Sequence, residues 1–235
     1  DEIEYKKRLF EKIDQIICVS ENTKKDLLDE YNIDASKISV VYHGVNKNKN
    51  FRERSLNIRP FILFVGSRQR YKNFDIAIKS YARSSRLKLD FDFVCFGGGK
   101  FLKIEEELFK NLSINRERIH HYEGDDQDLN YFYSNARIFI FPSLYEGFGM
   151  PLLEAMNMQC PIICSDTSSF PEIVNDSAIL FNPTDIEMLT FKIEKLIYDD
   201  QFLLDLKKKG NRNLNNYSWN KCANETERLY KNLII

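Results

Sequence analysis

The feature that most constrains the fold is a regular alternation of short apolar runs with longer stretches of helical period. Several runs are apolar at consecutive positions, as strands are when helices cover both faces of a parallel sheet. This alternation is typical of β-α units, so the sequence predicts an α/β fold with a Rossmann-like, doubly wound parallel sheet. The predicted strands are residues 15–19, 38–42, 61–65, 91–96, 118–122, 137–141, 161–164 and 178–181.

Helices are predicted between these strands, and further helices follow the last of them. Segment 43–59 interrupts the pattern because it is polar and rich in Asn and Lys, which is typical of a linker. The predicted helices are residues 21–30, 73–84, 101–111, 127–135 and 150–158, with two or three amphipathic helices in 185–216 and 219–233. We therefore expect a β-α-β piece in residues 1–45, a hinge at 46–59, one α/β domain at 60–216 and a terminal helix at 217–235.

Composition excludes several classes of protein. With 34 Lys and Arg against 35 Asp and Glu, the formal net charge is −1, which gives no whole-chain attraction to nucleic acid. The longest apolar runs have about five residues, whereas a membrane-spanning helix needs about 20. The scattered cysteines indicate reduced thiols, as in a cytoplasmic protein. The polar start of the sequence is unlike a signal peptide. The missing initiator Met indicates a piece of a longer chain.

The strongest candidate site is the segment S-L-Y-E-G-F-G-M-P-L-L-E at residues 143–154, between a predicted strand and a helix. Gly147 and Gly149 allow tight backbone geometry and the close approach of a ligand. The N–H groups and dipole of the first helical turn favour an anion. Glu146 precedes the helix, and Glu154 lies one turn inside it, where it can accept hydrogen bonds from a diol. On spacing alone, an ordinary β-α turn with capping acids is an equal alternative.

These residues, with five other segments, resemble the motifs of the family-4 glycosyltransferases, which are retaining nucleotide-sugar enzymes of the two-domain GT-B fold. E-G-F-G-M-P-L-L-E matches the family's E-x7-E motif. D-Q-I-I-C-V-S-E-N-T-K-K-D-L and V-V-Y-H-G-V-N resemble the end of the first domain and the hinge. F-V-G-S-R-Q-R-Y-K-N-F resembles the opening of the donor domain. P-I-I-C-S-D-T-S-S-F-P-E-I-V and Y-S-W follow in the family's order.

The resemblance implies a role for each matching residue of the E-x7-E segment. Glu154 would bind the ribose hydroxyls of the donor, and Glu146 would bind a hydroxyl of the donor sugar. Backbone N–H groups around Phe148, Gly149 and Met150 would meet the sugar and the phosphate. No metal or other cofactor is implied.

The basic segment at residues 66–73 is implied to clamp the diphosphate, where fixed cations stabilise the leaving group. Lys72 matches the family's lysine. The partner arginine is Arg68 or Arg70, and Arg68 fits the G-S-R variant better. Gly66 belongs to the same donor-binding set. Solvated surface cations are the alternative. At the ends of the next predicted strands, Gly97 would bring backbone near the nucleotide, and Tyr122 lies in a candidate base-contacting loop; ordinary turns are the alternative at both positions.

Two D-x-D pairs resemble the metal motif of the other main glycosyltransferase fold. Asp90 and Asp92 are expected to begin a strand with both acids on one face, whereas Asp126 and Asp128 precede a helix, where acids cap the N-terminus. Neither pair matches the ordered family motifs, so we expect no metal site.

A GT-B enzyme needs about 300 residues or more. The resemblance therefore assigns residues 1–45 to the tail of the N-terminal acceptor domain and 60–216 to the donor domain. Residues 217–235 would form the helix that crosses back. The missing domain, in the same or another chain, is an expected partner. We expect this chain to bind nucleotide but to transfer sugar poorly when alone.

The expected function is transfer of a hexose from a UDP- or GDP-linked sugar to a glycan or lipid-linked acceptor in surface polysaccharide biosynthesis. A nucleotide-sugar epimerase of the same fold and a non-catalytic nucleotide-sugar binding module are the alternatives. No nucleic acid partner is expected. The expected location is the cytoplasm, with peripheral contact at the inner face of the membrane left open.

Overall fold

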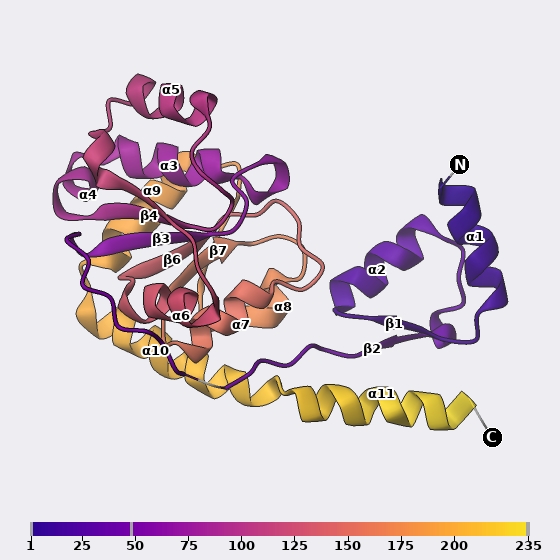
Figure 1. Ribbon diagram of the computed structural model, residues 1–235. Coiled ribbons are helices and arrows are strands. Elements are labelled where there is room, and N and C mark those ends of the chain that lie inside the picture. The colour runs from indigo at the N-terminus through magenta and orange to yellow at the C-terminus, as the bar shows by residue number, and fades with distance from the viewer. Residues whose placement is uncertain (1, 48, 234–235) are drawn as a thin grey trace.

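The computed structural model describes residues 2–47 and 49–233, and its centre is a six-stranded parallel sheet (Figure 1). The strand order is β5-β4-β3-β6-β7-β8, so the chain winds outward in both directions from β3. This arrangement confirms the predicted doubly wound α/β fold. The strands are β3 Phe61–Val65, β4 Asp92–Phe96, β5 Ile119–Tyr122, β6 Ile138–Phe141, β7 Ile162–Ser165 and β8 Ile179–Phe181.

Helices cover both faces of this sheet (Figure 1). One face carries α3 Phe74–Arg83, α4 Ser85–Asp90, α5 Lys103–Asn111 and α9 Ile186–Ile197. The other carries α6 Asp126–Asn135, α7 Met150–Asn157 and α8 Phe170–Val174, and α10 Asp200–Asn213 runs along the end of the domain.

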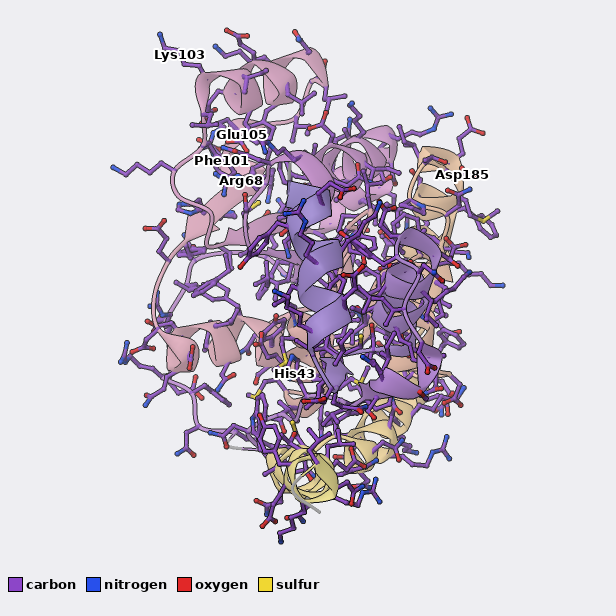
Figure 2. The ribbon with its side chains drawn as sticks, turned by 90° about the vertical axis from the view of Figure 1, so that its right-hand side faces the viewer. His43, Arg68, Phe101, Lys103, Glu105 and Asp185 are labelled. Atoms are coloured by element: carbon purple, nitrogen blue, oxygen red, sulfur yellow. The ribbon has the colours of Figure 1, made fainter. Side chains whose placement is uncertain are left out.

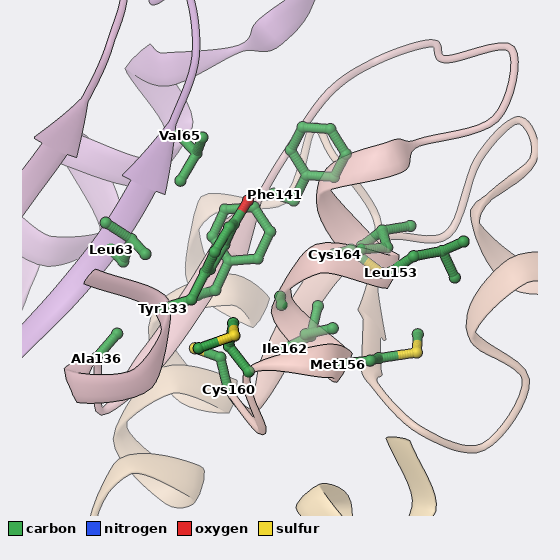
Figure 3. Packing of buried hydrophobic residues seen from close by; sticks show 14 of the residues in the cluster. Leu63, Val65, Tyr133, Ala136, Phe141, Leu153, Met156, Cys160, Ile162 and Cys164 are labelled. Atoms are coloured by element: carbon green, nitrogen blue, oxygen red, sulfur yellow. The ribbon is translucent and has the colours of Figure 1, made fainter. Parts of the chain in front are cut away.

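Alternate residues of the central strands pack into separate cores, because successive side chains of a strand point to opposite faces. Leu63 and Phe141 pack with the helices of the α7 face, where Figure 3 shows them beside Tyr133 and Ile162. Ile62 belongs to the other core. This burial on both faces explains why the strand segments read as continuous apolar runs.

The N-terminal piece is a β-α-β unit, as predicted. Strands β1 Ile16–Cys18 and β2 Ile38–Val40 pair in parallel, with α2 Glu21–Glu30 between them. This piece and the preceding α1 Glu2–Lys12 lie to one side of the large sheet, and α11 Trp219–Leu233 extends toward them (Figure 1). No described helix combines the length and the hydrophobicity needed to cross a bilayer.

The structure corrects several details of the sequence reading. Helices α1, α4 and α8 were not predicted; α4 and α8 are too short to show a clear helical period. The expectation that Asp90 and Asp92 both begin a strand is wrong, because Asp90 ends α4 and Asp92 opens β4. Helix α5 begins after residue 101, since Glu105 accepts a hydrogen bond from the Leu102 N–H. The domain boundaries stay a prediction.

The two connections between the N-terminal piece and the sheet domain cross at a backbone contact. A Cβ atom on Gly44 would lie 2.0 Å from the Trp219 nitrogen. The neighbouring His43 ring packs 5.0 Å from the ring of Phe148 and 5.7 Å from that of Trp219, centroid to centroid. The residues that follow β2 and the start of α11 therefore form one packed crossing.

Gly44→Ala is expected to lower the free energy of unfolding by about 1–3 kcal/mol, because the added methyl group must push two backbone segments apart. Gly147→Ala is the control, because its Cβ would lie 3.7 Å from its nearest neighbour, Thr23 Oγ1, which is an ordinary van der Waals contact. Chemical denaturation of both variants measures the difference. Equal stabilities would contradict the packed crossing.

Candidate functional site

The predicted site residues gather at the carboxyl ends of the parallel strands, where ligands of open α/β sheets bind. Gly66 follows β3 and Gly97 follows β4. The Gly66 N–H donates to the Phe96 carbonyl over 2.8 Å, and the Gly97 N–H donates to the Tyr122 carbonyl over 2.9 Å. These hydrogen bonds join the ends of β3, β4 and β5 into one edge.

Lys72 and Glu146 meet across this edge. Lys72 Nζ lies 2.7 Å from Glu146 Oε1, and each side chain is 15% exposed. Lys72 ends the short 3-10 turn η2 Arg70–Lys72, and its ammonium group also lies 5.0 Å from the centre of the Phe141 ring. The structure therefore brings a predicted cation and a predicted sugar-binding acid into one partly buried ion pair.

Asn73, which the sequence analysis did not single out, fixes the turn that carries Lys72. Its side-chain amide donates to the Pro142 carbonyl over 3.1 Å and to the Pro183 carbonyl over 2.9 Å. The Leu144 N–H also donates to the Tyr71 carbonyl over 2.7 Å. These bonds fix the position of the turn that carries Lys72 relative to the loop that carries Glu146. The only sequence feature that could have indicated this role is the position of Asn73 directly after Lys72.

The N-terminus of α7 faces the same edge. Gly149, its N-cap, has φ +92°, and a Cβ there would lie 2.9 Å from a ring carbon of Phe170. Only glycine meets both conditions without strain. Phe148 is buried and Met150 is half-buried, so the backbone of this turn is held in place. Such a helix start favours an anion.

Glu154 lies one turn further along α7, half-buried. The Tyr133 hydroxyl donates to Glu154 Oε2 over 3.2 Å. Burial raises the pKa of the Glu154 carboxyl, and the Tyr133 hydrogen bond lowers it in part. Tyr133 is fully buried, and sequence alone gave no reason to pair it with residue 154.

Arg68 does not reach the Lys72–Glu146 pair. Its buried guanidinium donates to Glu105 over 2.8 Å and to the carbonyls of Gly97 and Gly99 over 3.0 and 2.7 Å. It also stacks on Phe101, with 4.7 Å between the guanidinium carbon and the ring centre. Figure 2 shows Arg68, Phe101 and Glu105 together, apart from His43. In this arrangement Arg68 holds the glycine loop after β4.

Arg70, the other arginine of the basic segment, is exposed on the turn that carries Lys72. Its side chain makes no hydrogen bond or ion pair with any residue in the described part of the chain. Arg70 is therefore available to contact an anion, whereas the guanidinium of Arg68 is already bound to Glu105 and to the glycine loop.

Two buried hydroxyls at this edge lack partners. Ser143 follows β6 and Ser165 ends β7, and within residues 2–47 and 49–233 neither hydroxyl finds a hydrogen bond. Buried polar groups are nearly always satisfied, so these two hydroxyls on neighbouring strands are available to hydrogen-bond a polar ligand.

Two of the four D-x-D acids, Asp92 and Asp128, pair with cations. Asp92 accepts from Arg118 and lies 2.9 Å from His120 Nε2. Asp128 accepts from Arg52 and Arg54. Over the described residues, no three His, Cys, Asp or Glu side chains gather as metal ligands.

A cavity of about 500 Å³ lies elsewhere, between β8 and α9. It is lined mainly by apolar side chains with Lys192 and Lys195, and none of the predicted site residues lines it. A cavity of about 470 Å³ is lined by Lys100, Phe101 and Tyr122 beside the end of β5, so cavity volume does not decide between the two places.

The chain matches two family models. "Glycosyl transferases group 1" matches residues 46–213, and "Glycosyltransferase Family 4" matches residues 2–49. The first covers more than half of the chain, so this chain belongs to the group 1 glycosyltransferases. The predicted resemblance is confirmed.

Three curated relatives illustrate the match. The chain is 26% identical to O-antigen chain mannosyltransferase B of Escherichia coli, covering 98% of this chain and 65% of that protein. It is 30% identical to O-antigen chain mannosyltransferase RfbU of Salmonella typhimurium, covering 72% and 47%. It is 28% identical to the MMP alpha-(1->4)-mannosyltransferase of Mycolicibacterium hassiacum, covering 99% and 57%. The chain thus spans about half to two-thirds of these relatives.

Solved structures share the fold. Sucrose-phosphate synthase from Thermosynechococcus elongatus superposes with a TM-score of 0.84 at 21% identity, covering 100% of this chain and 62% of that one. Anabaena Alr3699/HepE, solved with UDP and glucose, gives a TM-score of 0.83 at 16% identity, covering 98% and 66%. The likeness shows the GT-B-like fold.

Glu154→Gln is expected to raise the melting temperature at about pH 8. Because burial raises the folded-state pKa of Glu154, the folded chain binds its proton more tightly than the unfolded chain, so stability falls as pH rises through the window between the two pKa values. Above that window the carboxylate costs its full desolvation, which the amide avoids while still accepting from Tyr133.

Thermal unfolding at about pH 8 and about pH 3 measures this effect, since the lower pH lies below the ordinary pKa range of a glutamate. The gain should be present at the higher pH and shrink at the lower one. A loss of stability at the higher pH would contradict the assignment of Glu154 as a desolvated acid.

Arg68→Ala is expected to lower the free energy of unfolding by about 3–5 kcal/mol, because it leaves the buried Glu105 without its cation. The double variant Arg68→Met/Glu105→Met removes both charges and should recover part of that loss. Urea denaturation of both proteins measures the difference. A double variant no more stable than Arg68→Ala would show that the ion pair is not the source of the effect.

Proposed function

We propose that this chain is the donor-binding half of a retaining glycosyltransferase that moves a hexose from a UDP- or GDP-linked sugar. The observation that carries the proposal is the Lys72–Glu146 pair, 2.7 Å apart, beside the start of α7. Glu154 on the same helix supplies the acid that a ribose diol requires. A cation, a helix N-terminus and two acids at one sheet edge match the parts of a nucleotide-sugar.

In the proposed reaction the leaving group is a nucleoside diphosphate, which gains negative charge as the bond to the sugar breaks. The Lys72 ammonium group and the N–H groups around Phe148, Gly149 and Met150 stabilise that charge because they are fixed before the reaction. Charge stabilisation in this scheme requires no metal. When the Lys72 ammonium group binds the phosphate, it separates from Glu146, and the Glu146 carboxylate can then accept a hydrogen bond from a sugar hydroxyl.

Arg68 is proposed to act in donor binding through the loop that it holds. Its guanidinium fixes the carbonyls of Gly97 and Gly99, while Gly66 and Tyr122 shape the adjoining strand ends. This loop would border the nucleotide. Arg70, which is exposed on the Lys72 turn, is the arginine free to add direct phosphate contact.

The sugar and acceptor are proposed from the relatives. Two of them are named as O-antigen chain mannosyltransferases, which supports mannose as the first sugar to test and a surface glycan or lipid-linked glycan as acceptor. Acceptor binding would require the part of those proteins that this chain does not span. We propose a cytoplasmic location, with peripheral contact at the inner face of the membrane.

Lys72→Met is expected to weaken binding of the nucleotide-sugar about tenfold to a hundredfold, because it removes a charge-assisted hydrogen bond of about 1.5–3 kcal/mol. Lys79→Met is the matched control, since Lys79 also pairs with an acid, Asp75, but lies on the outer surface of α3. Isothermal titration with GDP, UDP, GDP-mannose and UDP-glucose, with and without EDTA, measures both variants.

Equal affinity in Lys72→Met and Lys79→Met would overturn the proposed site. The alternatives are separated by activity once the missing domain is supplied. A transferase needs an acceptor to consume the donor, an epimerase converts the donor without an acceptor, and a binding module leaves the donor unchanged.

A further inference from the structure

The carbonyl groups of the loop that carries Glu146 are held by a row of hydroxyls. Ser169 Oγ donates toward the carbonyls of Glu146 and Phe148, at 3.0 Å from each. The Glu146 N–H in turn donates to Ser168 Oγ over 3.2 Å. Both serines belong to the sheet domain, in the turn between β7 and α8.

The carbonyl between them, that of Gly147, is held from the N-terminal piece instead. Ser20 Oγ donates to it over 2.6 Å and Thr23 Oγ1 over 3.1 Å. A carbonyl oxygen has two lone pairs and can accept both hydroxyls. Ser20 is fully buried and is also the N-cap of α2, because its oxygen accepts the Thr23 N–H over 3.0 Å.

The contact is reciprocal, because the sheet domain also caps α2. Glu172, on α8, accepts the backbone N–H groups of Glu21 and Asn22, each over 3.0 Å. The Tyr42 hydroxyl donates to the same carboxylate over 3.0 Å. A carboxylate at a helix N-terminus is favoured by the helix dipole and by the N–H groups that lack partners there. Figure 1 shows the N-terminal piece on the side of α7 and α8.

We propose that Ser20 and Thr23 are positioning residues for Glu146, so that seating of the N-terminal piece sets the sugar-contacting part of the site. This inference rests on the proposed function. Gly147 adjoins Glu146, whose carboxylate faces Lys72, so a shift of the Gly147 carbonyl moves the acid. Glu154 lies on α7, in the sheet domain, and its carboxylate accepts a hydrogen bond from the Tyr133 hydroxyl of the same domain. The ribose-contacting acid should therefore be independent of these hydroxyls, whereas the Phe148 N–H shares a peptide unit with the Gly147 carbonyl and is affected only in part.

The test compares a nucleotide with its sugar-linked form in variants that lose the hydroxyls. Thr23→Val deletes a hydroxyl at nearly constant shape and leaves the N-cap intact, whereas Ser20→Ala removes both the cap and the contact. Ser20→Thr restores the hydroxyl. Ser36→Ala, on an exposed residue of the same piece, is the control.

In the double variant Ser20→Ala/Thr23→Val, affinity for GDP-mannose or UDP-glucose should fall about threefold to tenfold, the range of one or two neutral hydrogen bonds. Affinity for GDP or UDP should fall less, because Lys72 and Glu154 do not depend on the Gly147 carbonyl. Unchanged affinity for the sugar-linked form, or an equal fall for both forms, would overturn the positioning role.

Hydrogen exchange of the amides of residues 144–150 gives a readout without ligand. Exchange there should quicken in Thr23→Val and return to the original rate in a variant that keeps a hydroxyl, Thr23→Ser. Exchange unchanged in Thr23→Val would refute the contact itself. Faster exchange in a chain that binds none of the four nucleotides would instead refute the proposed function, so the two failures are distinguishable.

Discussion

The loop from β6 to α7 must leave a buried strand and enter a buried helix while keeping its polar backbone satisfied, and the rest of the site depends on how it does so. Its carbonyls meet hydroxyls from two other parts of the chain, and the Asn73 amide holds the Pro142 carbonyl where the loop begins. A loop fixed in this way can hold Glu146 against Lys72 without a ligand. Buried backbone groups rarely remain unpaired, so these partners are a condition of the fold as well as of the site.

The Arg68–Glu105 ion pair and the acid Glu154 affect the stability of the fold in different ways. Arg68 and Glu105 are buried together, and their pairing holds the glycine loop while making each dependent on the other. Within residues 2–47 and 49–233 no cation pairs with Glu154; burial raises its pKa, so its charge opposes folding at neutral pH. A buried acid with that cost is easiest to explain by a ligand, and the proposed ribose diol supplies the hydrogen bonds that would offset it.

Much of the fold could be predicted from the sequence, because a strand that is buried on both faces, such as β3, consists of consecutive apolar residues. The carboxyl-edge location of Lys72 and Glu146 followed from the same reasoning, since parallel strands end together. Their direct pairing did not, because no spacing rule connects residues of different loops. The placement of Arg68 on Glu105, the bond from Tyr133 to Glu154 and the contact of Ser20 with Gly147 depend on side-chain directions that only packing decides.

The central claim is that the carboxyl edge at Lys72, Glu146 and Glu154 is the nucleotide-sugar site, and a crystal structure of this chain with a bound nucleotide-sugar tests it most directly. The account predicts the diphosphate within hydrogen-bond distance of Lys72 Nζ and the first turn of α7, with the ribose hydroxyls on Glu154. A nucleotide-sugar bound elsewhere, for example in the cavity between β8 and α9, would contradict it.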